Sequence, residues 1–199
     1  MLDVVAKLSN EARRFDARGL PPLVMMTDDE RLREPCAAAL RLPRGSLVVV
    51  RARGPKRRAA LASALARIAR RRELLLIVAD DPLLAARLGS HGVHFPEARA
   101  GEIAHWRAKR PQWLITASAH SLRAAANAAR FGADAVFVSS VFATKSHTER
   151  TPLGHLRLRR IAQIVDVPIY ALGGIDAHNV GQLRGANIAG IAAIGALAV

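Results

Sequence analysis

The chain has 199 residues, a formal net charge of +14, a hydrophobic fraction of 51% and an aromatic fraction of only 4%. This length suits one domain with an aliphatic core, and no apolar run is long enough to span a bilayer. The single cysteine, Cys36, excludes an intrachain disulfide and a cysteine-based metal cluster. Because the N-terminus lacks the apolar centre of a secretory signal, we expect a cytoplasmic protein with no membrane partner.

Basic residues are scattered along the chain rather than gathered in one motif. Lysine and arginine together number 30, and only four of these are lysine. A cationic surface attracts nucleic acids and acidic ligands alike. Base stacking needs aromatic side chains, of which the chain has few, so we expect no specific nucleic-acid partner.

Short aliphatic runs alternate with longer helical patterns along the whole chain. The expected strands are Leu23–Thr27, Leu47–Arg51, Leu74–Ala79, Gly92–His94, Trp113–Thr116, Ala135–Val138, Ile169–Leu172 and Gly190–Ile194. Several are apolar throughout, which is typical of strands buried on both faces. Helical patterns lie between them at residues 56–72, 82–89, 101–109, 121–131, 155–165 and 177–186.

This alternation predicts βαβ units and a parallel sheet, and eight strands favour a closed (β/α)₈ TIM barrel over a flavodoxin-like open sheet. We assign residues 19–199 to the barrel and residues 1–18 to an N-terminal helical extension. The sequence stops at Val199, just after the last strand, so we expect the last outer helix to be missing or very short. A helix over residues 3–15, or the second subunit of a homodimer, is expected to cover that part of the barrel.

The most informative local pattern is a pair of glycine-bearing strand ends. Gly173 and Gly174 follow one strand, and Gly195 follows the next. Glycine lets backbone N–H groups approach an anion closely, and the last two loops of such barrels commonly bind phosphate. We therefore expect a phosphate site there, although glycines that only form tight turns would give the same pattern.

A histidine, His120, follows the fifth strand and precedes a helix that Ser121 is expected to cap. Its ordinary pKa lies near neutrality, which suits proton transfer at the mouth of a barrel. A structural histidine beside the helix N-terminus is the alternative.

Charged residues follow the second and third strands. Arg51 and Arg53 are spaced to point the same way and could clamp a diphosphate, or could be ordinary surface charges. Asp80 and Asp81 follow the third strand. Either could bind Mg²⁺ beside a phosphate, or could cap the helix that begins at Pro82.

The segment after the sixth strand is a long polar loop. Its hydroxyl, basic and titratable side chains are Ser139, Ser140, Thr144, Lys145, Ser146 and His147. Long loops in compact domains are usually functional or disordered.

Taken in order, these pieces resemble the thiamin-phosphate synthase/TenI family from about Leu23 to Ile194. The matching blocks are "GVHFPEAR" at 92–99, "ASAHS" at 117–121, "GADAVFVSSVFATKSH" at 132–147, "PIYALGGI" at 168–175 and "GIAAIGAL" at 190–197. The resemblance implies a TIM barrel that is usually dimeric. It also implies phosphorylated thiazole and pyrimidine small molecules as ligands.

The family contains two kinds of enzyme. Synthase members join a hydroxymethylpyrimidine diphosphate to a thiazole phosphate and release pyrophosphate with Mg²⁺. TenI-type members instead tautomerise a thiazole carboxylate phosphate. The resemblance therefore implies a transferase or an isomerase, both acting on a phosphorylated thiazole.

Several family positions are kept. Arg51 matches the arginine after the second strand, Arg53 replaces a lysine, and Asp80 matches the first Mg²⁺ aspartate. The resemblance makes His120, Arg51 and Arg53 the expected catalytic residues. It also makes the expected substrate-binding residues Ser118, Ser139, Ser140, Thr144, His147, Gly154, Gly173, Gly174, Ile194 and Gly195.

Other family positions are changed. The expected glutamine is Val49, the asparagine before Asp80 is Ala79, and the second Mg²⁺ aspartate is Arg99. The Gly-Pro before the polar loop is Ser139-Ser140, and the loop lysine is replaced by His147.

The thiazole-phosphate half therefore looks intact, whereas the diphosphate and metal half looks degraded. We expect a synthase-like enzyme that binds Mg²⁺ weakly, with Arg99 pairing with Asp80, contacting diphosphate or pointing into solvent. The alternatives are a TenI-like tautomerase that uses His120 and a non-catalytic protein that only binds phosphorylated ligands.

Overall fold

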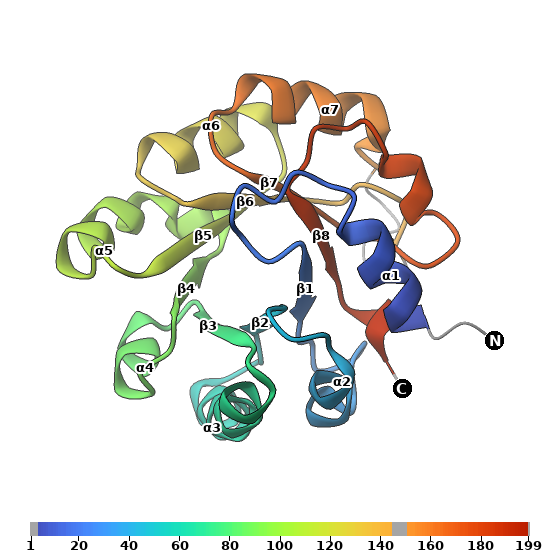
Figure 1. Ribbon diagram of the computed structural model, residues 1–199. Coiled ribbons are helices and arrows are strands. Elements are labelled where there is room, and N and C mark those ends of the chain that lie inside the picture. The colour runs from blue at the N-terminus through green and yellow to red at the C-terminus, as the bar shows by residue number, and fades with distance from the viewer. Residues whose placement is uncertain (1–3, 145–150, 199) are drawn as a thin grey trace.

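The computed structural model describes residues 4–144 and 151–198, in which eight parallel strands form a closed barrel in the order β1 to β8 (Figure 1). The strands are β1 (Leu23–Met26), β2 (Leu47–Val50), β3 (Leu75–Ala79), β4 (Gly92–Phe95), β5 (Leu114–Ala119), β6 (Ala135–Val138), β7 (Ile169–Leu172) and β8 (Gly190–Ala193). The TIM barrel predicted from the sequence is confirmed.

Helices surround the barrel on its outer side (Figure 1). They are α1 (Val4–Ala12), α2 (Pro35–Arg41), α3 (Pro55–Arg72), α4 (Pro82–Arg87), α5 (Ile103–Lys109), α6 (Leu122–Arg130) and α7 (Gly154–Ile164). Short 3₁₀ helices are η1 (Glu97–Glu102), η2 (Val180–Leu183) and η3 (Gly195–Leu197). The proline at the first position of α2, α3 and α4 suits a helix start, since its missing N–H has no partner there.

Local caps explain two of the helix boundaries. Ser121 accepts a hydrogen bond from the Ala124 N–H at 3.1 Å, which confirms the predicted N-cap of α6. Asp81 accepts from the Leu84 N–H at 2.9 Å and caps α4. Of the two aspartates after β3, Asp81 is therefore the helix cap, which leaves the Asp80 side chain for other partners.

The strand register decides which side chains point into the barrel. His94 on β4 is level with Thr116 on β5, and Phe137 on β6 is level with Tyr170 on β7. Phe137 and Tyr170 stack with ring centroids 4.9 Å apart, and the His94 ring meets Phe137 edge-on at 5.1 Å. The interior thus carries the rings of His94, Phe137 and Tyr170 among aliphatic side chains.

The barrel closes where β1 pairs with β8. The Tyr170 hydroxyl donates a hydrogen bond to the Pro21 carbonyl oxygen at 2.7 Å. Helix α1 contacts β1, η2 and η3, and Arg184 holds Glu11 of α1 at 2.6 and 2.9 Å. The helix predicted for residues 3–15 is therefore confirmed in its central part, and it covers the side of the barrel where β1 and β8 meet.

One predicted helix is wrong. Residues 177–186 form only the short η2. Asp176 accepts hydrogen bonds from the N–H groups of His178 and Asn179, and Gly185 has a φ of +75°. These turn-forming residues interrupt the helical pattern. The element after β8 is the short η3, and none of the described helices combines the length and apolarity needed to cross a bilayer.

Candidate active site

The predicted site residues come from six strands whose carboxyl ends lie at the same end of the barrel. They follow or end β2, β3, β5, β6, β7 and β8, and all neighbouring strands are parallel. His147 lies outside the described residues. The structure therefore brings the other predicted residues to one face of the barrel, which is where enzymes of this fold carry their chemistry.

Arg51 is fixed at the end of β2 through its backbone. Its N–H donates to the Thr27 hydroxyl at 2.8 Å, and that hydroxyl donates to the Arg51 carbonyl oxygen at 2.7 Å. The Arg51 guanidinium binds the Asp28 carboxylate at 2.6 Å, and Arg31 binds the same carboxylate at 2.8 Å. Burial alone would raise the pKa of Asp28, but the hydrogen bonds from Arg31 and from the Glu30 N–H together outweigh it and hold this pKa well below its usual range.

Arg53 and its neighbour Arg57 also contact acidic residues after β1. The Arg53 N–H donates to Asp29 at 2.7 Å, and its guanidinium binds Glu30 at 2.8 Å. Arg57 binds Asp29 at 2.9 Å. We call Asp28, Asp29 and Glu30 the acidic loop. Its contacts were not predicted, although three acidic residues directly after a strand at the same end as Arg51 were a usable signal.

Asp80 is bound by Arg99. The Arg99 Nη1 donates to the Asp80 carboxylate and, at 2.9 Å, to the Asp80 carbonyl oxygen. The other side of the guanidinium holds Glu102 at 2.5 and 2.7 Å. Hydrogen bonds from Glu102 and then Asp80 raise the pKa of Arg99 despite partial burial, so this cation stays charged.

This arrangement does not fit a Mg²⁺ site. An octahedral Mg²⁺ needs free carboxylate oxygens, and the Asp80 carboxylate already carries a guanidinium. A second cation beside Arg99 would be repelled. Among the residues that the structure describes, no group of three or more His, Cys, Asp or Glu side chains is placed to hold a metal ion.

His94 is a buried polar residue of the barrel interior, beside Ser118, that the site prediction did not include. Its Nδ1 lies 2.8 Å from the Thr116 hydroxyl and its Nε2 lies 2.8 Å from the Ser118 hydroxyl. Burial, with a contribution from the charge of Arg51, lowers the pKa of His94 to about 3. His94 is therefore neutral and fixes the Ser118 hydroxyl below the site. The block "GVHFPEAR" was the signal for it.

His120 lies at the end of β5 with its ring oriented by the next strand. Its Nδ1 donates to the Ser139 carbonyl oxygen at 2.9 Å, and the Ser139 hydroxyl lies 3.1 Å from the same nitrogen. The His120 N–H donates to Glu97 at 2.7 Å. Because a carbonyl can only accept, Nδ1 carries the proton in the neutral ring, and Nε2 is left as the basic nitrogen.

The two glycines after β7 pack against the segment after β6. Gly173 and Gly174 have φ values of +98° and +68°. A Cβ on Gly173 would lie 2.9 Å from Ser140, and one on Gly174 would lie 2.5 Å from the Ala143 carbonyl oxygen. Backbone conformation and close packing therefore both require glycine here.

Gly195 differs from these two glycines. Its φ is not in the left-handed region, and a Cβ added to it would meet only the Arg31 carbonyl oxygen, at 3.8 Å. The fold thus does not demand glycine at this exposed position. Close approach of a ligand to the backbone would demand it.

The remaining predicted residues lie around these glycines. Gly154 begins α7 with a φ of +75°, and its N–H donates to the Val141 carbonyl oxygen at 3.0 Å. Ile194 is almost buried beside Gly195. The Thr144 hydroxyl oxygen is shielded from water and has no hydrogen-bond partner among the described residues.

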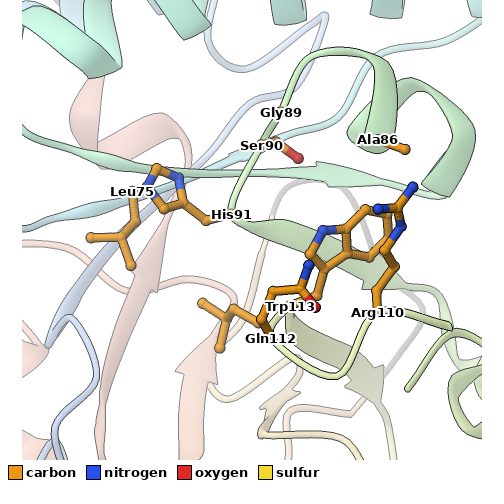
Figure 2. A pocket seen from close by; sticks show the side chains of 9 residues that line it. Leu75, Ala86, Gly89, Ser90, His91, Arg110, Gln112 and Trp113 are labelled. Atoms are coloured by element: carbon orange, nitrogen blue, oxygen red, sulfur yellow. The ribbon is translucent and has the colours of Figure 1, made fainter. Parts of the chain in front are cut away.

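A hollow of about 510 Å³ lies at the opposite end of the barrel, beside the amino ends of β3, β4 and β5 (Figure 2). Leu75 and His91 lie on one side of it, and Arg110 and Trp113 on the other. Its described lining contains none of the predicted site residues. The predicted chemistry and this hollow are therefore separate features.

The sequence matches the family model described as thiamine monophosphate synthase over residues 23–197. The chain belongs to the thiamine monophosphate synthase family. A thiamine-phosphate synthase of Herpetosiphon aurantiacus is 32% identical over 171 residues, which cover 83% of this chain and 82% of that protein. A thiamine-phosphate synthase of Pyrococcus abyssi is 34% identical over 132 residues, which cover 66% of this chain and 63% of that protein.

Two further relatives agree with this membership. A putative thiamine-phosphate synthase 2 of Aquifex aeolicus is 34% identical over 115 residues, or 58% of this chain, and the match spans 61% of that protein's length. The solved structure of a thiamine phosphate pyrophosphorylase from Pyrococcus furiosus superposes with a TM-score of 0.71 and 25% identity. The superposition covers 92% of this chain and 87% of the Pyrococcus furiosus chain.

Proposed function

We propose that the protein is a thiamine-phosphate synthase-like transferase that binds a thiazole phosphate at the ends of β7 and β8. A hydroxymethylpyrimidine diphosphate would bind weakly at the ends of β2 and β3. The observation that carries this proposal is the gathering of Arg51, His120, Ser139 and the glycines at one end of one closed barrel.

The phosphate end is supported by Gly195 and Thr144. Gly195 leaves its backbone open to a ligand although the fold does not require glycine. The Thr144 hydroxyl is shielded from water without a partner among the described residues. A buried hydroxyl without a hydrogen bond is unfavourable, and a phosphate oxygen would remove that cost.

The transfer step needs positioning and charge stabilisation. As the thiazole nitrogen bonds to the pyrimidine methylene carbon, the bond from that carbon to the diphosphate oxygen breaks, and negative charge develops on the departing pyrophosphate. Arg51 and Arg53 are two of the cations at that end, and their backbones are fixed by Thr27 and Asp29. Asp80 orients Arg99 in this proposal, and we expect only weak Mg²⁺ binding.

Pyrophosphate release tests this function. The purified protein is mixed with both substrates, with Mg²⁺ or with a chelator, and pyrophosphate and thiamin phosphate are measured. We expect slow release of both products in equal amounts, and a further loss of about tenfold or more in Arg51→Gln. Rapid turnover that depends on tightly bound Mg²⁺ would contradict the weak-metal part of the proposal.

A second candidate is favoured by the His120 geometry. With Nδ1 held by the Ser139 carbonyl, Nε2 can accept and return a proton on a phosphate-anchored thiazole. Exchange of substrate hydrogen with deuterated water, without pyrophosphate release and lost in His120→Gln, would identify this tautomerase. Ligand-induced stabilisation without either reaction would identify a non-catalytic binding protein.

The homodimer expected from the sequence stays a prediction. Helix α1 already contacts β1 and the elements around β8, so this part of the barrel wall does not need a second subunit. Sedimentation at micromolar concentration decides the oligomeric state.

A further inference from the structure

We propose that the acidic loop occupies the diphosphate position at Arg51 and Arg53, so that the site prefers ligands with a single phosphate. This inference rests on the proposed function, since it concerns the same site. It assigns Asp28, Asp29 and Glu30 as residues that determine specificity against a diphosphate.

The contacts imitate those of a bound anion. Carboxylates and phosphates offer similar oxygen acceptors to a guanidinium. Asp28 binds the Arg51 guanidinium at 2.6 Å, and Glu30 binds that of Arg53 at 2.8 Å. The Asp29 carboxylate accepts a hydrogen bond from the Arg53 N–H at 2.7 Å and forms an ion pair with the Arg57 guanidinium at 2.9 Å. The groups that would bind a diphosphate thus already hold carboxylate oxygens.

Two of the three carboxylates, those of Asp28 and Asp29, are better anchored than Arg51 and Arg53. The side chains of Asp28 and Asp29 are each 13% exposed, whereas those of Arg51 and Arg53 are 52% and 82% exposed. Asp28 also accepts hydrogen bonds from the N–H groups of Glu30 and Arg31, at 3.2 and 3.1 Å. A diphosphate would therefore have to compete with carboxylates that stay in place, and it would meet them as like charges.

The neighbouring strand end adds to this effect. Arg99 lies between Asp80 and Glu102, so two carboxylates accompany one guanidinium. The β7 and β8 end instead offers the backbone of Gly173, Gly174 and Gly195. A phosphate monoester can use that end without displacing the acidic loop, whereas a diphosphate at β2 and β3 cannot.

Isosteric neutral variants test the proposal. Asp28→Asn and Asp29→Asn keep an oxygen acceptor for the backbone N–H groups, and Glu30→Gln changes an exposed side chain. The combined triple variant is titrated calorimetrically with pyrophosphate in chelator, and separately with inorganic phosphate. Its pyrophosphate affinity should rise about tenfold or more over wild type, since each exposed pair contributes about two- to fourfold. Its affinity for inorganic phosphate should change less than about twofold.

Glu73→Gln is the matched control for Glu30→Gln alone. Both glutamates are well exposed, at 64% and 68%, and each binds one arginine, at 3.1 and 2.8 Å. Only Glu30→Gln should raise pyrophosphate affinity, by about two- to fourfold. Adding Arg51→Gln to the triple variant should return its pyrophosphate affinity to the wild-type level. Thermal unfolding of each variant verifies the fold.

Three results would overturn the proposal. The first is unchanged pyrophosphate affinity in both the triple variant and Glu30→Gln. The second is an equal gain in Glu73→Gln, which would indicate a general charge effect. The third is an equal gain for inorganic phosphate. The proposed function fails separately if wild type forms no product from both substrates, whatever the acidic-loop variants bind.

Discussion

The guanidinium of Arg99 binds Asp80 twice from one nitrogen, once at the carboxylate and once at the backbone oxygen. The carboxylate that the family resemblance makes a candidate Mg²⁺ ligand is thereby paired with an internal cation. The exchange removes one anionic ligand and adds a positive charge at the place where a divalent ion would lie.

Restoring the family residues should restore metal affinity. We expect Arg99→Asp with Ala79→Asn to raise Mg²⁺ affinity by about tenfold, because a unit repulsion disappears and an oxygen ligand returns. Isothermal titration with MgCl₂ measures this directly. Arg67→Asp on α3 makes the same charge change away from the site and should leave Mg²⁺ affinity unchanged. Equal gains in both variants would contradict the assignment.

Gly174 provides a test of the backbone at the phosphate end. We expect Gly174→Ala to lower the free energy of unfolding by about 1–3 kcal/mol, because of its positive φ and the close Ala143 oxygen. Its affinity for inorganic phosphate should fall as the loop shifts. Gly181→Ala is the control, since a Cβ there meets nothing within 4 Å and φ is not in the left-handed region. Urea unfolding and phosphate titration measure both effects, and equal behaviour of the two variants would count against this explanation.

His94 should make the fold sensitive to acid. In the folded protein the pKa of His94 is about 3, below its ordinary value of 6.5. Between pH 3 and pH 6.5 the folded state therefore binds fewer protons than the unfolded state. The stabilisation is full above pH 6.5 and is lost progressively as the pH falls toward 3. The free energy of unfolding should drop by about 1.4 kcal/mol per pH unit in this window from this residue alone.

His94→Gln should flatten that dependence. The variant can keep hydrogen bonds to Thr116 and Ser118 but has no proton to bind. Urea unfolding at pH 7, 6 and 5 gives the two slopes. If wild type and variant lose stability in parallel, His94 is not the acid-sensitive group.

Arg107 should contribute to the stability of the fold and not to ligand binding. At the amino ends of β5 and β6 it binds Asp134 at 2.5 Å and the carbonyl oxygens of Pro111 and Trp113, both at 2.9 Å. We expect Arg107→Ala to cost about 2–3 kcal/mol of unfolding free energy, because the partly buried Asp134 carboxylate and Trp113 carbonyl oxygen lose their donor. The exposed Arg123→Ala should cost less than about 0.5 kcal/mol in the same urea titration.

The strands were predictable because barrel strands are buried on both faces and appear as aliphatic runs. Ala135–Val138 and Ile169–Leu172 match the expected bounds, and β5 extends three residues beyond its expected end, to Ala119. The helix expected at 177–186 failed because Asp176 and Asn179 form a side-chain turn that competes with helical hydrogen bonds.

The sequence predicted where the site residues lie in the barrel, but it did not predict which side chains they contact. Strand order alone brings Arg51, Asp80 and His120 to one end of the barrel. The pairing of Arg51 with Asp28, and of Arg99 with Glu102 as well as Asp80, depends on side-chain directions across neighbouring elements. Periodicity carries no information on these directions. The burial of His94 likewise follows from the register between β4 and β5.

The pairing of β1 with β8 has a consequence for how the protein forms during synthesis. Leu23, Val24 and Met25 find their partners on β8, and α1 packs on η2 and η3, which also come late in the chain. Strand β1 and helix α1 leave the ribosome before β8, η2 and η3, so these contacts cannot form until those elements emerge. Until residues 180–197 emerge, one edge of β1 and the apolar side of α1 stay exposed, and nascent chains arrested before that point should bind chaperones and be cut readily by proteases.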